Sequence, residues 1–323
     1  MSPVLSIHDL RVEFDTPAGT VKAVRGVNLD VEPGELVGVV GESGSGKSVS
    51  FLSIMGLLPE TAHVSGSAKV AGTELIGVPA KQVRSQRGKK IAMIFQDPLS
   101  ALNPVHKVGA QIVEMIRAHQ DVTKEAAHAR AVELLDLVGL PQPDVRALQY
   151  PHEFSGGMRQ RVMIAMAIAN DPEVLIADEP TTALDVTVQA QILEVIENVR
   201  RQLRTAVVFI THDLGVVARV ADRVEVMYAG NTVERGLVND IFAEPHHPYT
   251  QGLLSSLPTA GKERLRPIVG APPNMISPPS GCAFRPRCAH AVEECASAPA
   301  GLVRVGSTET SCIRAVELSV RPA

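Results

Sequence analysis

Apolar and polar positions alternate along the first thirty residues of the chain. Apolar side chains recur on both sides of the turn at 16–19, at Val4, Leu10, Val12, Phe14, Val21, Ala23, Val27, Leu29 and Val31. Alternation with a period of two, broken by a turn that contains proline and glycine, is typical of two antiparallel strands. Residues 4–31 are therefore predicted to form an antiparallel strand pair.

Short apolar runs further along the chain predict the strands of a second sheet. They cover residues 36–40, 91–95, 174–177, 206–210 and 224–228, and helical patterns separate them. Uniformly apolar strands that alternate with helices are typical of βαβ units, whose parallel sheets are buried on both faces. The core fold is therefore predicted to be α/β.

A long helical insertion is expected before the strand at 174–177. Within it, Thr123 can cap a helix that runs through Val138, and Gly139 can close that helix. We expect the insertion, about residues 97–172, to form a separate helical lobe. After Asp185 another helix is predicted, with an apolar stripe that we interpret as core packing: Val188, Ile192, Ile196, Val199 and Leu203.

The composition changes after about residue 240, where prolines interrupt a segment with little periodicity that ends in a tail containing the cysteines. We predict one large domain over residues 1–240 and a small, irregular one over 241–323. The hydrophobic fraction of 45% is ample for a buried core.

Charge and hydropathy narrow the choice of partners. Lys and Arg number 31 against 35 Asp and Glu, so no overall basic field indicates nucleic acid, and we expect no nucleic-acid partner. The N-terminal sequence lacks the pattern of a secretory signal. The longest apolar runs, such as residues 162–169, are much shorter than the roughly 18 to 20 residues that a helix needs to cross a bilayer. We expect a cytoplasmic protein whose contact with a membrane comes through a partner.

A glycine-rich loop follows the predicted strand at 36–40 and precedes an apolar helix start. It reads Gly41, Glu42, Ser43, Gly44, Ser45, Gly46, Lys47 and Ser48, with Val49 after it. In this context glycines let backbone N–H groups surround phosphate oxygens, the lysine adds a full positive charge, and the Ser48 hydroxyl can ligate magnesium. We predict a nucleoside triphosphate site, and a chance glycine loop is the alternative.

An acidic pair, Asp178 and Glu179, ends the predicted strand at 174–177. At this edge of the sheet Asp178 is expected beside the magnesium that Ser48 holds, and Glu179 can face a water that attacks the terminal phosphate. Such a pair can also be only a polar turn, but the glycine loop upstream favours the catalytic interpretation.

A second anion-binding loop is predicted at Ser155, Gly156 and Gly157, which begin another helix. Two phosphate-binding loops in one chain suggest a nucleotide that is shared across a dimer interface. A simple turn remains the alternative.

The order of these motifs resembles that of ATP-binding cassette (ABC) proteins. The resemblance includes Gln96 after the strand at 91–95, Asp185 after Ala183-Leu184, and His212 after the strand at 206–210. It implies an ABC-type nucleotide-binding domain with a RecA-like parallel core sheet, an antiparallel β subdomain and a helical subdomain. It also implies that Gln96 senses nucleotide and Mg²⁺ and faces a membrane partner, that Asp185 lies at the dimer contact, and that His212 holds the terminal phosphate. With Glu179 and Lys47, these residues form the expected catalytic set for ATP.

Two positions depart from the family pattern. The signature loop has Phe154 and Met158 where the family has leucine and glutamine, which leaves its serine and backbone amides intact. The aromatic residue that stacks on adenine is usually a tyrosine, and the candidate here is Phe14, which keeps the π-face. Phe14 can equally be a core strand residue.

Three stretches, 95–104, 181–190 and 246–250, resemble the ATPases of dipeptide and oligopeptide importers. This resemblance implies a peripheral subunit at the cytoplasmic face of the membrane, paired with a second ABC ATPase subunit. Its further partners are expected to be two membrane permeases and, through them, an extracytoplasmic peptide-binding protein. Nickel and other small-solute importers are similar in the same stretches, and a soluble ABC ATPase without a permease is the remaining alternative.

All four cysteines lie near the end of the chain: Cys282, Cys288, Cys295 and Cys312. Clustered cysteines in a cytoplasmic protein favour a metal site over disulfides, and four unrelated thiols are the alternative. Zinc sites commonly use Cys-x-x-Cys knuckles, which are absent here, whereas iron–sulfur clusters accept wider spacings. We therefore predict a 4Fe–4S cluster, with zinc as the alternative, that ties the irregular tail to the ATPase domain.

Overall fold

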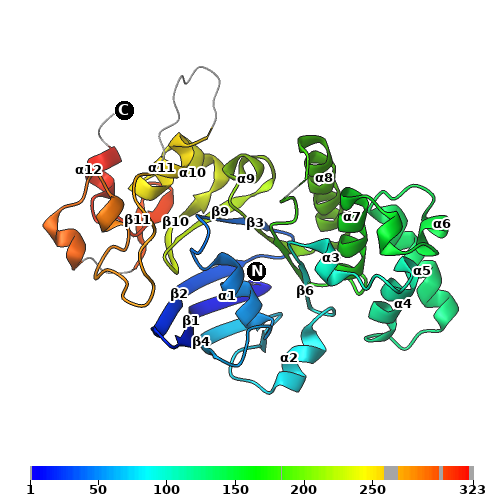
Figure 1. Ribbon diagram of the computed structural model, residues 1–323. Coiled ribbons are helices and arrows are strands. Elements are labelled where there is room, and N and C mark those ends of the chain that lie inside the picture. Colours follow the sequence, from blue (N-terminus) through cyan, green and yellow to red (C-terminus); the bar gives the residue numbers. More distant parts are fainter. Residues whose placement is uncertain (1, 183, 258–267, 298–300, 320–323) are drawn as a thin grey trace.

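The central sheet of the protein consists of eight short strands among the described residues (Figure 1). The computed structural model describes residues 2–182, 184–257, 268–297 and 301–319. Within them the sheet has the order β11-β12-β10-β9-β3-β8-β7-β6. Its strands are β3 (Leu36–Val40), β6 (Ile91–Ile94), β7 (Val174–Asp178), β8 (Ala206–Thr211), β9 (Arg223–Tyr228), β10 (Asn231–Leu237), β11 (Val303–Val305) and β12 (Thr308–Thr310).

Consecutive residues of the central strands face two different cores. In β8, Val207 and Phe209 pack into the core on the side of the helical lobe, while Ala206, Val208 and Ile210 pack into the other. Strands β3, β6, β7, β8 and β9 pair in parallel. Burial on both faces explains why β3 and β6 are apolar throughout and why β7 and β8 are apolar up to their last residue, and it confirms the predicted parallel α/β core.

The smaller sheet is antiparallel, with the order β2-β1-β4-β5. Its strands are β1 (Leu5–Thr16), β2 (Gly19–Val31), β4 (Ala62–Val70) and β5 (Thr73–Glu74). The pairing of Thr16 with Gly19 and of Leu5 with Val31 confirms the strand pair predicted for residues 4–31. One face of this sheet covers the second core together with α1 (Lys47–Ile54).

The helical lobe lies beside the far end of the central sheet, in green at the right of Figure 1. It contains α3 (Pro98–Ala101), α4 (Val108–Arg117), α5 (Lys124–Leu137), α6 (Pro143–Ala147) and α7 (Gly156–Ala167), with a 3₁₀ turn at Pro151–Glu153. The Thr123 side chain accepts a hydrogen bond from the N–H of Ala126, and Gly139 adopts a φ of 72° after the helix. The predicted cap and helix end are therefore confirmed.

The remaining helices cover the sheet and the C-terminal segment. They are α2 (Ala80–Gln86), α8 (Val186–Leu203), α9 (Leu214–Val220), α10 (Val238–Ala243), α11 (Pro248–Ser255) and α12 (Ala315–Ser319), with 3₁₀ turns at Arg285–Arg287 and Glu293–Ala296. Asp185 caps α8 by accepting from the N–H groups of Thr187 and Val188. Ile192, Ile196 and Val199 of α8 are buried, as expected of core packing. Among the described helices, none is both long and apolar enough to cross a membrane.

The C-terminal segment extends the central sheet. The hairpin of β11 and β12 pairs with the edge strand β10, where Glu234 faces Thr310 and Arg235 faces Glu309. The buried carboxylate of Glu234 also accepts hydrogen bonds from the backbone N–H groups of His246 and His247, at 2.6 and 3.1 Å. Backbone pairing and a buried carboxylate thus join residues beyond α10 to the sheet.

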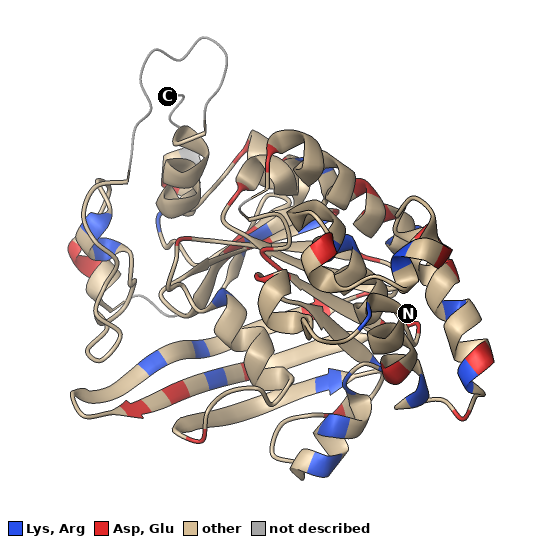
Figure 2. Ribbon diagram, turned by 45° about the vertical axis from the view of Figure 1, so that its right-hand side comes forward, with Lys and Arg blue, Asp and Glu red and all other residues tan. Residues whose placement is uncertain are grey.

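Charged side chains of both signs are interspersed along the ribbon in the view of Figure 2. One of them, Glu225 of β9, is only 1% exposed. It accepts a hydrogen bond from the Thr232 hydroxyl at 2.6 Å, whereas its Oε2 atom has no hydrogen-bond partner among the described residues. Burial raises the pKa of Glu225 to about 7, although the Thr232 hydrogen bond opposes the shift.

We predict that Glu225→Gln removes a pH-dependent part of the stability. Because the folded-state pKa lies above the ordinary value, the wild-type protein loses stability as the pH rises from 5 to 8, by at most about 3 kcal/mol. The variant keeps an acceptor for Thr232 and lacks this loss, so its advantage grows with pH. Urea unfolding at several pH values measures it, with exposed Glu244→Gln as control; parallel curves for Glu225→Gln and wild type contradict the assignment.

Candidate functional site

The loop between β3 and α1 packs against neighbouring backbone, which leaves no room for a side chain at two of its glycines, Gly41 and Gly46. A Cβ at Gly41 would lie 2.2 Å from the Met227 carbonyl oxygen, and one at Gly46 would lie 2.6 Å from the Ala23 carbonyl oxygen. Both glycines also have positive φ, 153° and 98°. The loop therefore takes this curved path only with glycine at these positions.

Lys47 is held inside this loop by the loop's own backbone. Its Nζ donates to the carbonyl oxygens of Gly41 at 2.8 Å and Glu42 at 3.1 Å, and the residue is 6% exposed. Burial lowers the pKa of Lys47, and the carboxylates of Glu179, Asp178 and Glu42 oppose the shift. Within the described residues, carbonyl oxygens are the hydrogen-bond partners of this buried cation, so it is well placed to exchange them for phosphate oxygens.

Ser48 and Asp178 meet at the carboxyl edge of the sheet, as predicted. The Ser48 hydroxyl donates to Asp178 Oδ1 at 2.8 Å. Burial raises the pKa of Asp178, opposed by the Ser48 hydrogen bond and supported by the charge of Glu179. A hydroxyl and a carboxylate beside a phosphate-binding loop are the hard oxygen ligands that Mg²⁺ prefers, so this donor pair fits the ion.

The Glu179 carboxylate contacts several polar side chains beside the glycine loop. Its Oε2 accepts from Thr182 Oγ1 at 2.8 Å and from Gln96 Nε2 at 3.2 Å, and its Oε1 lies 3.3 Å from His212 Nδ1. Burial by itself would raise the pKa of Glu179, but hydrogen bonds from Thr182 and His212 outweigh it and lower the pKa. The carboxylate is therefore kept ionised and oriented.

The backbone of Glu179 supports this orientation. Its φ is 47°, a left-handed conformation that costs a residue with a side chain about 1–2 kcal/mol. The N–H of Glu179 donates to the Ile210 carbonyl of the neighbouring strand at 2.9 Å, which holds the turn in place. Strain at a polar residue beside a cavity is typical of a functional site.

These residues line one open cavity of about 620 Å³, formed by residues 43–49 together with Gln96, Glu179, Thr182 and His212. The predicted phosphate, metal and catalytic residues thus converge on a space of the size that ligand sites usually have. Sequence reasoning missed Thr182, although it lies only three residues after Glu179.

The remaining predicted residues do not line this cavity. Ser155 caps α7 by accepting from the Met158 N–H, and Ser155 and Gly156 are exposed. A Cβ at Gly157 would lie 2.5 Å from Val188 at the start of α8, so α7 and α8 begin side by side. Phe14 packs against the core under the antiparallel sheet. The phosphate contacts of residues 155–157, the adenine contact of Phe14 and the dimer contact of Asp185 stay predictions, and Ala183 lies outside the described residues.

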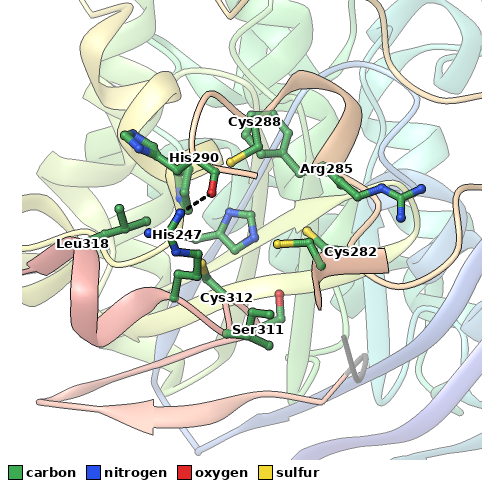
Figure 3. A pocket seen from close by; sticks show the side chains of 13 residues that line it. His247, Cys282, Arg285, Cys288, His290, Ser311, Cys312 and Leu318 are labelled. Atoms are coloured by element: carbon green, nitrogen blue, oxygen red, sulfur yellow. Dashed lines mark hydrogen bonds between the residues drawn. The ribbon is translucent and has the colours of Figure 1, made fainter. Parts of the chain in front are cut away.

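The four cysteines line a second, small cavity in the C-terminal segment (Figure 3). Cys282, Cys288, Cys295 and Cys312 all face it, with His247 and His290 on its wall. All four thiols are free, and the Cys282 N–H donates to the Cys295 carbonyl at 2.8 Å. The expected convergence of thiols from distant parts of the segment is therefore present.

The environment of these thiols disfavours their charged form. Burial raises the pKa of Cys282, of Cys288 and of Cys312, the last to about 11, and the neighbouring cysteines contribute to each increase. A metal centre reverses this by deprotonating its thiol ligands. The cavity measures about 20 Å³, room for roughly one water. Among the described residues, no three His, Cys, Asp or Glu side chains are already arranged to hold a single ion. Binding of a metal by the cysteines would therefore require the loops that carry them to move.

Two family models match the chain. The model described as ABC transporter matches residues 24–182, and the one described as oligopeptide/dipeptide transporter, C-terminal region, matches residues 233–295. The first spans the glycine loop, residues 155–157 and the Asp178–Glu179 pair. The second spans α10, α11 and three of the four cysteines.

Relatives that match this chain over most of its length are ATP-binding proteins of peptide transport. The oligopeptide transport ATP-binding protein OppD of Bacillus subtilis is 54% identical over 90% of this chain and 82% of its own length. The dipeptide transport ATP-binding protein DppD of the same organism is 51% identical over 97% of this chain and 95% of its own. OppD of Mycobacterium tuberculosis is 53% identical over 100% of this chain but 54% of its own length, so the chain spans about half of that relative.

Solved structures agree with the fold. A dimeric ATP-binding cassette in a post-hydrolysis state with ADP and phosphate is 26% identical and covers 72% of this chain and 98% of its own, with a TM-score of 0.65. The CbiO1 subunit of a Clostridium perfringens ABC transporter complex, also 26% identical, covers 76% of this chain and 92% of its own, with a TM-score of 0.64.

Proposed function

The chain belongs to the ABC transporter ATPases, and from that membership we propose that it binds and hydrolyses ATP to power the import of di- or oligopeptides. The observation that carries the proposal is the convergence of Lys47, Ser48, Glu179 and His212 on one cavity, with Asp178 bonded to Ser48, in a chain whose C-terminal segment matches peptide transporters. Import of nickel or another small solute by the same machinery is the alternative.

The residues of the cavity suit phosphoryl transfer to water. The ionised carboxylate of Glu179 polarises the attacking water, and Gln96 and His212 hold that carboxylate in place. Lys47 exchanges its carbonyl partners for phosphate oxygens and stabilises the negative charge that develops on them. Ser48 and Asp178 would hold Mg²⁺, which neutralises charge on the phosphate oxygens when it is bound.

A second ABC subunit completes the site in this proposal. The cavity lacks the signature residues 155–157 of the same chain, which are instead presented at the surface where α7 and α8 begin side by side. Val186, directly after Asp185, is 83% exposed, so its apolar side chain is available for a protein contact. Each subunit would then offer its signature loop to the nucleotide of the other.

An apolar groove next to Gln96 supports a membrane partner. It is lined by Leu57, Phe95 and a group of methionines: Met55, Met93, Met115, Met163 and Met166. Leu57 and Phe95 are 40% and 36% exposed. Methionines form adaptable binding surfaces, and the groove ends at the residue before Gln96, which bonds to Glu179. We propose that a permease subunit inserts a cytoplasmic segment here. The position of that segment would then affect the catalytic carboxylate of Glu179 through Gln96.

This contact would hold the chain at the cytoplasmic face of the membrane. Two permeases are expected for a pair of ABC subunits, one on each groove. The extracytoplasmic peptide-binding protein would then reach the complex through the permeases alone.

The four cysteines are proposed to hold a 4Fe–4S cluster, with zinc as the alternative. Four thiols on one cavity wall supply the complete ligand set of such a cluster. The described part of the surrounding segment contains short helices, 3₁₀ turns and one short hairpin, β11–β12, so a metal centre would add the cross-link that its small apolar core lacks. The proposed role is structural.

We predict that Glu179→Gln binds ATP like the wild type but hydrolyses it about 10²–10⁴ times more slowly, because the amide cannot accept the proton of the attacking water. Glu173→Gln, at the opposite end of the same strand, serves as control. Steady-state ATPase assays and equilibrium binding of ATP measure the two effects. Unchanged turnover in Glu179→Gln excludes the catalytic role.

We predict that Leu57→Glu abolishes co-purification of permease subunits from membranes, because a carboxylate in the apolar groove must be desolvated against methionines. Binding of ATP to the variant chain should be unchanged. Val105→Glu places the same charge on an exposed position outside the groove and should retain the permeases. Mass spectrometry of the affinity-purified complexes distinguishes the two, and full retention by Leu57→Glu rejects the groove as the docking site.

We predict that Cys288→Ser, purified without oxygen, loses about four irons and their acid-labile sulfide per chain. Ser311→Ala changes another residue of the same cavity wall and should keep the cluster. Analysis of iron, sulfide and zinc distinguishes the 4Fe–4S cluster from the alternative, a zinc site. A folded wild-type chain without any metal rejects both.

A further inference from the structure

One ion pair joins the glycine loop to the C-terminal segment. Arg287 Nη1 lies 2.7 Å from Glu42 Oε2, and Arg287 Nη2 lies 3.0 Å from Glu42 Oε1. The Arg287 side chain is 5% exposed, so solvent screens the pair weakly. Two parallel N–H···O bonds fix the direction of the carboxylate as well as its distance.

Arg287 is itself immobilised. Its remaining guanidinium N–H groups donate to three further oxygens, those of Val269 at 3.1 Å, Tyr228 at 3.3 Å and Ile268 at 3.4 Å. The guanidinium also lies over the rings of Tyr228 and Phe284, 5.8 and 5.9 Å from their centroids. The hydrogen bond to Glu42 raises the pKa of Arg287 above its ordinary value. Arg287 is thus a fixed point for the loop.

The backbone of Glu42 is held on both sides as well. Its N–H donates to the Tyr249 hydroxyl at 2.8 Å, and Tyr249 is fully buried. Its carbonyl oxygen accepts from Lys47 Nζ at 3.1 Å. Because Lys47 is bonded to the backbone of Glu42, the place of Glu42 helps to set where the phosphate-binding ammonium group lies.

Arg287 and Tyr249, which both bond to Glu42, lie next to residues that line the cysteine cavity. Arg287 directly precedes Cys288, and Tyr249 stands two residues after His247, which lines the same cavity. The ring of Phe284, another lining residue, packs on Tyr249 at a centroid distance of 5.4 Å. The cysteine cavity and the glycine loop are therefore connected through side chains that are buried or fully bonded.

We propose that Arg287 is a positioning residue of the nucleotide site, which holds the glycine loop ready for phosphate, and that metal in the cysteine site strengthens ATP binding through it. The proposal rests on the proposed ATPase function and adds a control of that same site. A ligand of the cysteines restricts the 3₁₀ turn Arg285–Arg287 and so fixes Arg287 further. The coupling is reciprocal, so ATP should tighten retention of the metal by the same factor.

The experiment compares ATP affinity in the purified full chain, metal-loaded and metal-stripped. Arg287→Gln should bind ATP about tenfold more weakly, and Arg287→Lys should recover part of the loss because it keeps the charge but not the paired hydrogen bonds. Glu42→Gln should weaken binding similarly, and the double variant should be no worse than either single one. Stripping the metal should weaken binding about tenfold in wild type and hardly at all in Arg287→Gln.

Arg285→Gln is the matched control, because Arg285 lies in the same 3₁₀ turn and lines the cysteine cavity but has no hydrogen bond or ion pair with Glu42 in the described chain. It should bind ATP like the wild type. ATP affinities of Arg287→Gln and Glu42→Gln within twofold of wild type overturn the proposal, and so does an equal effect of stripping in wild type and Arg287→Gln. A wild-type chain that holds no metal overturns the link to the cysteines. Failure of the proposed function is distinct, since the wild type would then bind no ATP at all.

Discussion

Burial of the five parallel strands on both faces is the constraint on which the rest of the structure depends. Their side chains alternate between two cores, and in β3, β6, β7 and β8 polar side chains occur only at or after the carboxyl end of the strand. The carboxyl ends of β3, β7 and β8 lie next to one another, and the glycine loop, the acidic pair and His212 follow directly. The site is therefore concentrated at one edge by the same pattern that makes the core.

The elements that the sequence made predictable are those with local signals. Thr123 and Asp185 cap helices through hydrogen bonds to residues two or three positions away. The apolar strands are recognisable from their composition. The glycine loop was equally predictable, because its glycines, lysine and serine stand at a fixed spacing directly after an apolar strand. Ser48 and Asp178 could be paired in advance because the carboxyl ends of parallel strands meet at the same edge of the sheet, here with only β8 between β3 and β7.

What could not be predicted depends on contacts between distant residues without a local pattern. The sequence offers Arg287 only as one more surface arginine in a proline-rich segment, and Glu42 as a variable position within the loop. In the structure they form a partly buried pair 245 residues apart in sequence. Tyr249 reads as part of a peptide-importer motif, and its bond to the glycine loop appears only in the folded chain. Likewise, no sequence pattern indicates that the tail adds β11 and β12 to the central sheet.

The addition of β12 to the edge of β10 has a consequence for how the protein is made. Chains emerge from the ribosome N-terminus first, so β10 leaves long before the hairpin that pairs with it. Until then its outer row of N–H and C=O groups is unpaired, and an unpaired edge can recruit strands from other chains. Cys312, which follows β12, also emerges after the other three cysteines. The unpaired edge of β10 and the incomplete set of cysteines therefore persist until the same late stage of synthesis.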